Sequence, residues 1–152
     1  MRPDSRLSRM LHVLLHLANA ERPLTSAQIG AMLGTNPVVV RRTMSGLRER
    51  GYVLSDKGHG GGWRIACDLR QVSLLDIHKA VGGPTLFAIG NDTDKPNCAF
   101  EKAVNAALTD ALGAAEVILL KQLADTSLAD LAKDFSSMCR SGGAPASAEG
   151  ST

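Results

Sequence analysis

The sequence predicts a mainly α-helical protein with one small β-hairpin, and three features lead to this prediction. Asn36 starts a short basic helix that stops near Gly51. Two short extended runs, 52–56 and 62–66, follow and are joined by a glycine-rich tip. A near-heptad apolar stripe then begins close to Cys98. Together these features predict a winged helix-turn-helix domain followed by a long dimerisation helix.

The composition suits one compact domain, or a small domain with a dimerisation arm. Of the 152 residues, 44% are hydrophobic and only 3% are aromatic, so the core must be aliphatic, which favours helices. Three scattered cysteines do not resemble a secreted disulfide framework. No apolar run approaches the ~18 residues needed to span a bilayer. His12 and His16 interrupt the apolar N-terminal run, so we expect a helix of a cytoplasmic protein rather than a signal peptide.

Charge is divided unevenly between the two halves of the chain. Residues 1–67 hold ten Lys/Arg and four Asp/Glu, a net charge of +6. Residues 68–152 hold seven Lys/Arg and eleven Asp/Glu, a net charge of −4. A basic first half predicts contact with a polyanion such as double-stranded DNA. The alternative is an uneven surface that is only solvated.

A three-residue turn, 34–36, separates two of the expected helices. This is the spacing of a helix-turn-helix, in which a short turn sets two helices at a steep angle. Caps are expected from Thr25 or Ser26, from Asn36 and from Ser73. In the first half of the chain, apolar residues at helical spacing predict helices at 5–20, 26–33, 37–50 and 74–81.

The tip of the hairpin has four glycines within residues 58–62. Glycine suits a tip that bends sharply or passes close to another backbone. A phosphate cradle is one alternative, but the spacing is not that of a P-loop and Lys57 precedes the glycines. A merely flexible loop is another. The helix-turn-helix before the hairpin favours a wing, with Trp63 as its packed base.

The second half is expected to serve assembly. The apolar stripe predicts a helix from about Cys98 to Ala124, about 40 Å long at ~1.5 Å per residue. So long a helix needs a partner, most simply its own copy, and packing against the first helix is the alternative. A last helix is expected at 128–135. The predicted division is a winged helix-turn-helix domain at 1–81, a linker at 82–97, dimerisation and C-terminal helices at 98–136, and a disordered tail at 137–152.

The stripe of the long helix also predicts the dimer face. Its apolar positions recur with a near-heptad period, and charges of both signs flank them. The residues expected at the interface are Phe100, Val104, Leu108, Ala111, Leu112, Ala115 and Leu119.

Several segments resemble a known family. LRERGYVLSDKGHGGGW, then SLLDIHKAV, a cysteine at the start of a long helix, and TSLADL are similar to the Rrf-two family of bacterial winged-helix regulators, which includes IscR, NsrR and CymR. The resemblance covers residues 5–135, and TNPVVVRR is most similar to the YwnA-type branch. It implies a homodimer built on the long helices, recognition helices in successive major grooves, and wings that reach the minor groove.

The cysteines depart from the family pattern. Iron–sulfur members carry three, and with Cys98 as the last, the other positions fall near Asp92 and Leu86, while a histidine of some members falls on Glu101. Only Cys98 matches, so no cofactor is expected and no metal ligands are assigned. In some members the first helix of the other subunit completes the cluster site, so His12 leaves a non-standard iron–sulfur regulator open as an alternative.

DNA contacts are expected on the third helix, the wing and the start of the second helix. Arginine can bind guanine O6 and N7 with paired donors, valine can contact a thymine methyl, and a narrow minor groove attracts cations. Arg48 is assigned to phosphate, as are Thr25 and Ser26 through backbone amides. Pairing of the arginines with Glu49 is the alternative. The remaining candidates are Asn36, Val38, Val39, Arg41 and Arg42 on the third helix, and Lys57 and His59 on the wing.

Cys98 is the sensor candidate. It follows Asn97 at the start of the long helix, where the dipole and free amides stabilise a thiolate, and a change there would act on the hinge to the DNA-binding part. An inert cysteine is the alternative. His12 and His16 have an i, i+4 spacing compatible with metal ligation but lack a third ligand. His78 is expected on the exposed side of the fourth helix.

The leading functional hypothesis is a sequence-specific DNA-binding transcription regulator, a dimeric repressor with thiol or small-molecule sensing. Its homodimer would favour a roughly palindromic operator. The alternative class is a winged-helix protein-interaction module that docks a partner enzyme. An enzyme is not expected, because the sequence has no GxSxG, no HExxH and no clustered Asp/Glu/His constellation.

Overall fold

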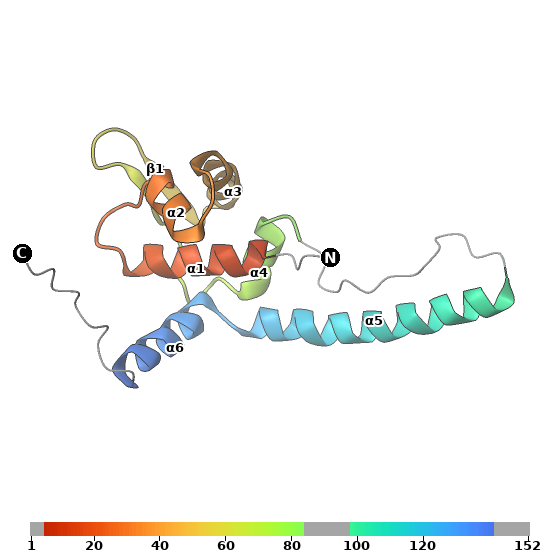
Figure 1. The fold of residues 1–152 in the computed structure, drawn as a ribbon. Helices are drawn as coiled ribbons and strands as arrows, with labels where there is room; N and C mark the ends of the chain where they lie inside the picture. The colour runs from red at the N-terminus through yellow and green to blue at the C-terminus, as the bar shows by residue number, and fades with distance from the viewer. Residues whose placement is uncertain (1–4, 84–97, 142–152) are drawn as a thin grey trace, which may run out of the picture.

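The computed structural model describes residues 5–83 and 98–141. These residues form six helices and one antiparallel hairpin, which confirms the mainly α-helical class. In Figure 1, α1 to α4 and the hairpin form one body, and α5 extends away from it. The elements are α1 (Arg6–Asn19), α2 (Ser26–Leu33), α3 (Pro37–Glu49), β1 (Val53–Asp56), β2 (Gly62–Ile65), α4 (Leu74–Ala80), α5 (Ala99–Asp125) and α6 (Leu128–Ser141).

The turn between α2 and α3 is set by capping residues. Thr25 Oγ1 accepts a hydrogen bond from the Gln28 amide at 3.1 Å, and Gln28 Oε1 accepts one from the Thr25 amide at 2.8 Å. Gly34 ends α2 in the left-handed conformation, with φ 63°. Asn36 Oδ1 accepts a hydrogen bond from the Val38 amide at 2.8 Å and so caps α3. The caps predicted for both helices are confirmed.

The hairpin is held along both edges of β2. β1 and β2 pair antiparallel, with Val53 opposite Ile65. On its other edge β2 pairs with Leu24, because the Leu24 amide donates to the Trp63 oxygen at 2.9 Å and the Trp63 amide donates to the Leu24 oxygen at 2.8 Å. Gly62 permits this approach, since a Cβ there would lie 2.5 Å from the Leu24 oxygen. The wing is therefore fixed beside the start of α2.

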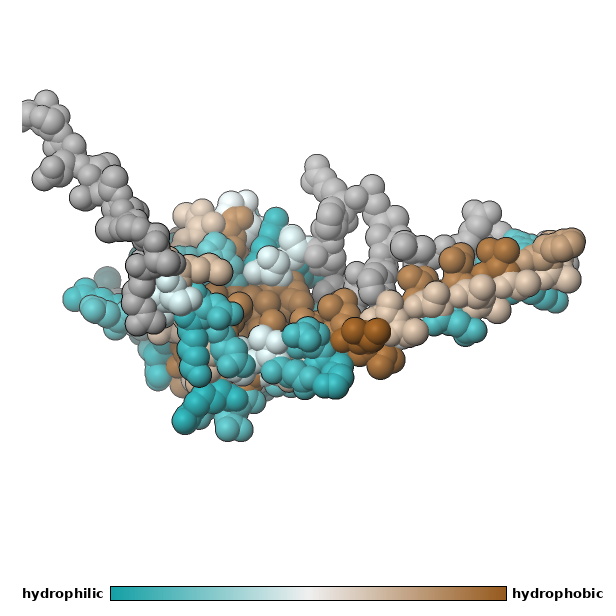
Figure 2. Space-filling model, turned by 90° about the horizontal axis from the view of Figure 1, so that it is seen from below, coloured by the Kyte–Doolittle hydropathy of each residue, from teal (hydrophilic) through white to brown (hydrophobic). Residues whose placement is uncertain are grey.

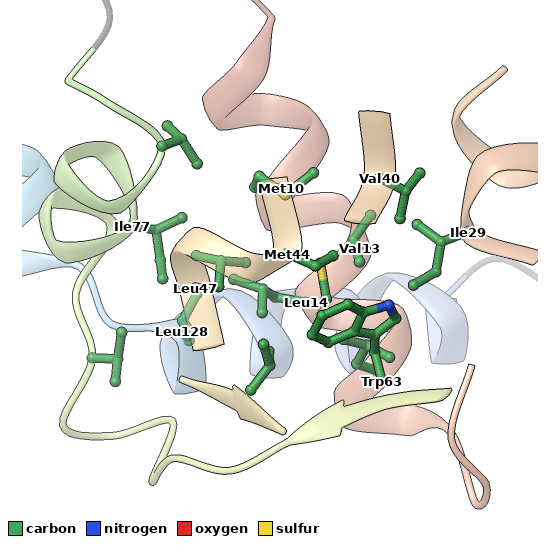
Figure 3. Packing of buried hydrophobic residues seen from close by; sticks show 14 residues of the cluster. Met10, Val13, Leu14, Ile29, Val40, Met44, Leu47, Trp63, Ile77 and Leu128 are labelled. Carbon is green, nitrogen blue, oxygen red and sulfur yellow. The ribbon is translucent and has the colours of Figure 1, made fainter. Parts of the chain in front are cut away.

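One hydrophobic cluster joins the elements of the body. Met44 and Leu47 are fully buried and Val40 is 1% exposed, which confirms the predicted inward face of α3. Figure 3 shows these side chains packed with those of α1, α2 and α4 around Trp63. Leu128, from α6, is 1% exposed in the same cluster. The core is thus mainly aliphatic, as the composition predicts.

Backbone hydrogen bonds tie the C-terminal end of α5 to the body. The Leu74 amide donates to the Thr126 oxygen, and the Leu128 amide donates to the Val72 oxygen, both at 2.9 Å. These bonds hold the α5–α6 corner against the start of α4. Because this end of α5 is held, the rest of the helix extends from the body toward its N-terminal tip (Figure 1).

α5 has 27 residues, and none of them is buried. Phe100 is 86% exposed, Val104 57% and Ile118 72%. Figure 2 shows apolar side chains along one edge of this helix and hydrophilic ones along the other. Val117, also 68% exposed, lies on the side opposite the predicted dimer stripe. An exposed apolar surface of this size is typical of a face that interacts with another protein or with a membrane.

The apolar character of α5 corrects the expectation about membranes. Within the two described ranges, α5 is long and apolar enough to cross a membrane by length and composition, with a mean hydropathy of 1.5 in an 18-residue window. The expectation that no segment approached this was wrong, because it considered uninterrupted apolar runs, whereas α5 spaces a few charges among many apolar residues. Length and composition alone do not separate a membrane span from a helix that a partner covers.

Two further expectations differ from the structure. α6 continues to Ser141 rather than ending near residue 135, so residues 137–141, which were expected to belong to the disordered tail, are helical. His78 is buried, at 6% exposure, so its expected exposed position was wrong. The reason is that α1, α3 and α5 all contact the short helix α4, which leaves it little free surface. The predicted linker, apart from 82–83, and the end of the predicted tail from residue 142 lie outside the described residues.

Candidate nucleic-acid interface

The outer face of α3 is the centre of the candidate interface. Because the core residues of α3 face inward, Arg41 and Arg42 are exposed to solvent. Val38 and Val39 are also exposed, at 55% and 51%. Asn36 is exposed as well, but its Oδ1 already caps the helix. The structure therefore leaves the five predicted α3 residues accessible to solvent.

Arg48 lies toward the wing rather than beside these residues. Its Nη1 donates to Ser55 Oγ at 3.4 Å, and its guanidinium carbon is 5.9 Å from the centre of the Trp63 ring. The side chain therefore contributes a cation–π contact and connects α3 to β1. Arg48 is exposed, so its charge remains available to a phosphate at the junction of helix and wing.

Both hydroxyls at the start of α2 are already hydrogen-bonded within the protein. Thr25 Oγ1 caps the helix, and Ser26 Oγ accepts a hydrogen bond from Trp63 Nε1 at 3.0 Å. The second bond also satisfies the buried indole, which confirms Trp63 as the packed base of the wing. What this helix terminus can still offer a phosphate is its first backbone amides and its dipole.

Two predicted basic residues stand at the tip of the wing. Lys57 and His59 are both exposed, and Gly58 between them has φ 89°, a conformation that glycine favours. Behind the tip, Arg64 Nε bonds Asp56 Oδ2 at 3.0 Å across the hairpin. The tip therefore presents two residues that can carry positive charge, while the charge of Arg64 is paired.

Arg9 is a neighbour of this surface that the sequence argument did not select. A hollow of about 60 Å³ is lined by Arg9 of α1 together with Val39 and Thr43 of α3. The sequence indicated only that Arg9 lies outside the apolar residues that recur at helical spacing in α1. Its place beside α3 depends on how the two helices pack, which the spacing of residues does not give.

The predicted dimer stripe also remains accessible in the single chain. Phe100, Val104 and Leu108 are exposed, as are the two alanines. Leu112 and Leu119 are partly exposed. The α3 surface belongs to the body, whereas the stripe lies on α5, which extends away from the body (Figure 1).

Comparison with known proteins identifies the family to which this architecture belongs. The family model Rrf2, described as an iron-dependent transcriptional regulator, matches residues 4–134. The chain belongs to the Rrf2 family. Its function is therefore that of a DNA-binding transcription regulator, and the resemblance noted in the sequence is confirmed.

Individual Rrf2-type relatives agree in length as well as in fold. The Bacillus subtilis (strain 168) protein YwnA, named as an HTH-type transcriptional regulator, is 31% identical over 129 residues, which are 84% of this chain and 95% of YwnA. A Lactobacillus plantarum protein described as a transcriptional regulator superposes with a TM-score of 0.69 at 23% identity, over 87% and 90% of the two chains. CymR, the global cysteine regulator of B. subtilis, superposes with a TM-score of 0.56 at 21% identity, over 88% of this chain and 97% of CymR. Both structures show the shared fold.

The Rrf2 description mentions iron, but the residues described do not fit an iron–sulfur cluster. Such clusters are held mainly by several Cys thiolates. Within residues 5–83 and 98–141, no three His, Cys, Asp or Glu side chains come together as a metal site. Cys98 is a single exposed thiol whose Sγ accepts a hydrogen bond from the Glu101 amide at 3.4 Å. Leu86 and Asp92, at the other two family positions, lie outside the described residues.

Cys98 is the N-cap of α5 and lies at the end of that helix farthest from the body (Figure 1). From the sequence we expected it at the hinge between the DNA-binding part and the dimerisation helix. The structure places it at the distal tip instead, because the opposite end of α5 is the end bonded to α4 and α6. The thiol is exposed at the N-terminus of α5, where its Sγ accepts the hydrogen bond from the Glu101 amide.

Cys67 provides an internal comparison for Cys98. It packs against the core after β2 and is only partly exposed. Burial raises the pKa of the Cys67 thiol, with the hydrogen-bonded backbone acting in the opposite direction. Because the thiolate is the reactive form, Cys67 is the less reactive position.

Proposed function

We propose that this Rrf2 regulator is a cytoplasmic homodimer that represses transcription by binding a roughly palindromic operator in double-stranded DNA. The observation that carries the proposal is α5, which has 27 residues and buries none of them in the single chain. Covering its exposed apolar side chains is favourable in water. A second copy presents the same stripe, so a two-fold symmetric interface covers both helices at once.

In this proposal residues 1–81 bind DNA, 82–97 connect, and 98–136 form the dimer. Two-fold symmetry presents two copies of α3 and two wings, so the operator is an inverted repeat with half-sites one or more helical turns apart. We assign base contacts to the exposed arginines and valines of α3, because these side chains match guanine edges and thymine methyls.

The remaining contacts position the protein. We assign phosphate contacts to Arg48 and to the first amides of α2 at Thr25 and Ser26. Lys57 and His59 at the wing tip are assigned to the minor groove, where a narrow AT-rich segment attracts a cation. Asn36 has two roles in the proposal, as the cap of α3 and as a contact at the groove edge.

The test is selection of genomic DNA fragments followed by affinity measurement on variants. Arg41→Ala and Arg42→Ala should each lose about 1–3 kcal/mol of binding and relax specificity at one position per half-site. Arg70→Ala is the matched control, because Arg70 pairs with Asp68 at 2.9 Å and lines a hollow beside α5 and α6, away from α3. Its affinity should be unchanged.

Salt dependence separates the wing from α3. Lys57→Ala should weaken binding and reduce the slope of log affinity against log salt by about one, since one positive charge that displaces counterions from the DNA is lost. No gel shift at low salt, or unchanged affinity in all three variants, would contradict DNA recognition by this surface and favour the protein-interaction module.

We further propose that Cys98 reports a thiol oxidant or an electrophile to the dimer. Support comes from its exposure at the N-terminus of α5, on the helix that forms the proposed interface. DNA binding measured with and without oxidant should change in the natural protein and stay constant in Cys98→Ser. An identical response in both would exclude Cys98 as the sensor.

A further inference from the structure

Two histidines on α1 take part neither in the DNA surface nor in the dimer stripe. His12 and His16 are both exposed and lie one helical turn apart. Their Nε2 atoms are 2.9 Å apart, and their ring centres are separated by 4.7 Å. Both rings therefore direct the same nitrogen toward one point above the helix surface.

We propose that His12 and His16 form a bidentate site for a divalent transition-metal cation of the Ni²⁺ or Cu²⁺ class. Without metal, one Nε2 carries the proton that it shares with the other ring. On metal binding both Nε2 lone pairs are donated to the cation. The proton on the donor ring moves to its Nδ1 through solvent, so both imidazoles stay neutral and no redox change is required.

The nitrogen separation is compatible with the proposed class of metal. With metal–nitrogen bonds of ~2.05 Å, a separation of 2.9 Å corresponds to an angle of about 90° at the metal. That is the angle of tetragonal and octahedral coordination, which Cu²⁺ and Ni²⁺ adopt with nitrogen and oxygen ligands. A tetrahedral zinc site would need the nitrogens about 3.3 Å apart. The pair therefore needs little movement of its side chains to bind a metal of the former class.

The core fixes the backbone that carries the two rings before a metal binds. Val13, Leu14 and Leu17, which lie between or beside the histidines in sequence, are 0%, 1% and 4% exposed. The backbone of this part of α1 is thus fixed by the core, and chelation requires ordering of the side chains alone. Because the described residues supply no third ligand, water completes the coordination and the metal exchanges readily.

Titration of the full-length protein with Ni²⁺ tests the site, since Ni²⁺ does not oxidise the thiols. Calorimetry should show one site per chain. His12→Gln and His16→Gln should each weaken binding at least about tenfold, because either change removes the chelate. The double variant should bind more weakly than either single variant, because each single variant keeps one imidazole ligand. His59→Gln, which removes an exposed histidine from the wing, is the matched control and should bind as the natural protein does.

Histidine ring resonances provide a readout that does not depend on affinity. Paramagnetic Ni²⁺ should broaden the His12 and His16 ring signals together, at concentrations where those of His59 and His78 persist. Simultaneous broadening of His59 would overturn the proposal, as would affinities of the two single variants within twofold of the natural protein. Circular dichroism checks that the variants keep their helices.

Discussion

The body of the protein buries its apolar side chains, whereas its longest helix, α5, leaves them exposed. In the body, fourteen apolar side chains are each less than a tenth exposed and form one cluster. None of the 27 residues of α5 is buried. The body therefore buries its apolar side chains within its own chain, whereas we propose that a second copy of the chain covers those of α5. Substitutions in the two regions should accordingly change different properties, the first folding and the second association.

The largest effect is expected in the body. Leu47→Ala removes a fully buried side chain of α3 and leaves a cavity, so the free energy of unfolding should fall by about 2–5 kcal/mol. Chemical denaturation followed by circular dichroism measures it. Leu54→Ala is the same change at a position that is 42% exposed and should cost less than about 0.5 kcal/mol. Equal losses would show that the body has no such core in solution.

A smaller effect on association is expected in α5. Val104→Asp places a charge in the predicted stripe and should weaken the dimer about tenfold to hundredfold, with little change in helix content. Val117→Asp makes the same change on the opposite side of the helix, at 68% exposure, and should leave the dimer intact. Sedimentation velocity over a range of concentrations compares them. If Val117→Asp dissociates the dimer and Val104→Asp does not, the interface lies on the other face.

Asn36 allows its two roles to be separated. Asn36→Ala removes the cap of α3 and should cost about 1 kcal/mol of stability, measured by denaturation. Asn36→Ser keeps a capping oxygen, so stability should be retained. If the side-chain amide also contacts DNA, the serine variant should bind its operator more weakly while folding normally. Unchanged DNA affinity in Asn36→Ser would leave capping as its function.

The smallest contrast is between two thiols. Cys98 is exposed on α5. Burial raises the pKa of the Cys67 thiol, so a smaller fraction of Cys67 is the reactive thiolate near neutral pH. Alkylation with iodoacetamide at pH 7.5, followed by peptide mass spectrometry, should therefore label Cys98 before Cys67. Faster labelling of Cys67 would mean that the packing around β2 opens in solution.

Local signals explain why much of the fold could be predicted from the sequence. Capping by Asn36 and Ser73 depends on side chains within three residues, and the close approach at Gly62 follows from a glycine-rich tip after a helix-turn-helix. His78 was misplaced because its burial depends on three other helices packing around α4. Spacing along one short helix does not contain that information.

The candidate site could be predicted in part for the same reason. The exposed α3 residues lie off the buried stripe of Val40, Met44 and Leu47 because of helical periodicity alone. The positions of Arg9 beside α3, of Arg48 over Trp63, and of Cys98 at the far end of α5 depend on tertiary packing. Their roles in DNA binding and sensing, and the domain boundaries, stay predictions.

The mass of the natural protein in solution tests most directly whether α5 is completed by a second copy. Sedimentation equilibrium without detergent or lipid, at several concentrations, compares the observed mass with the 16.0 kDa of one chain. The account predicts a species of twice that mass that dissociates only on dilution. A single-chain mass at every concentration, with α5 still helical, would contradict it.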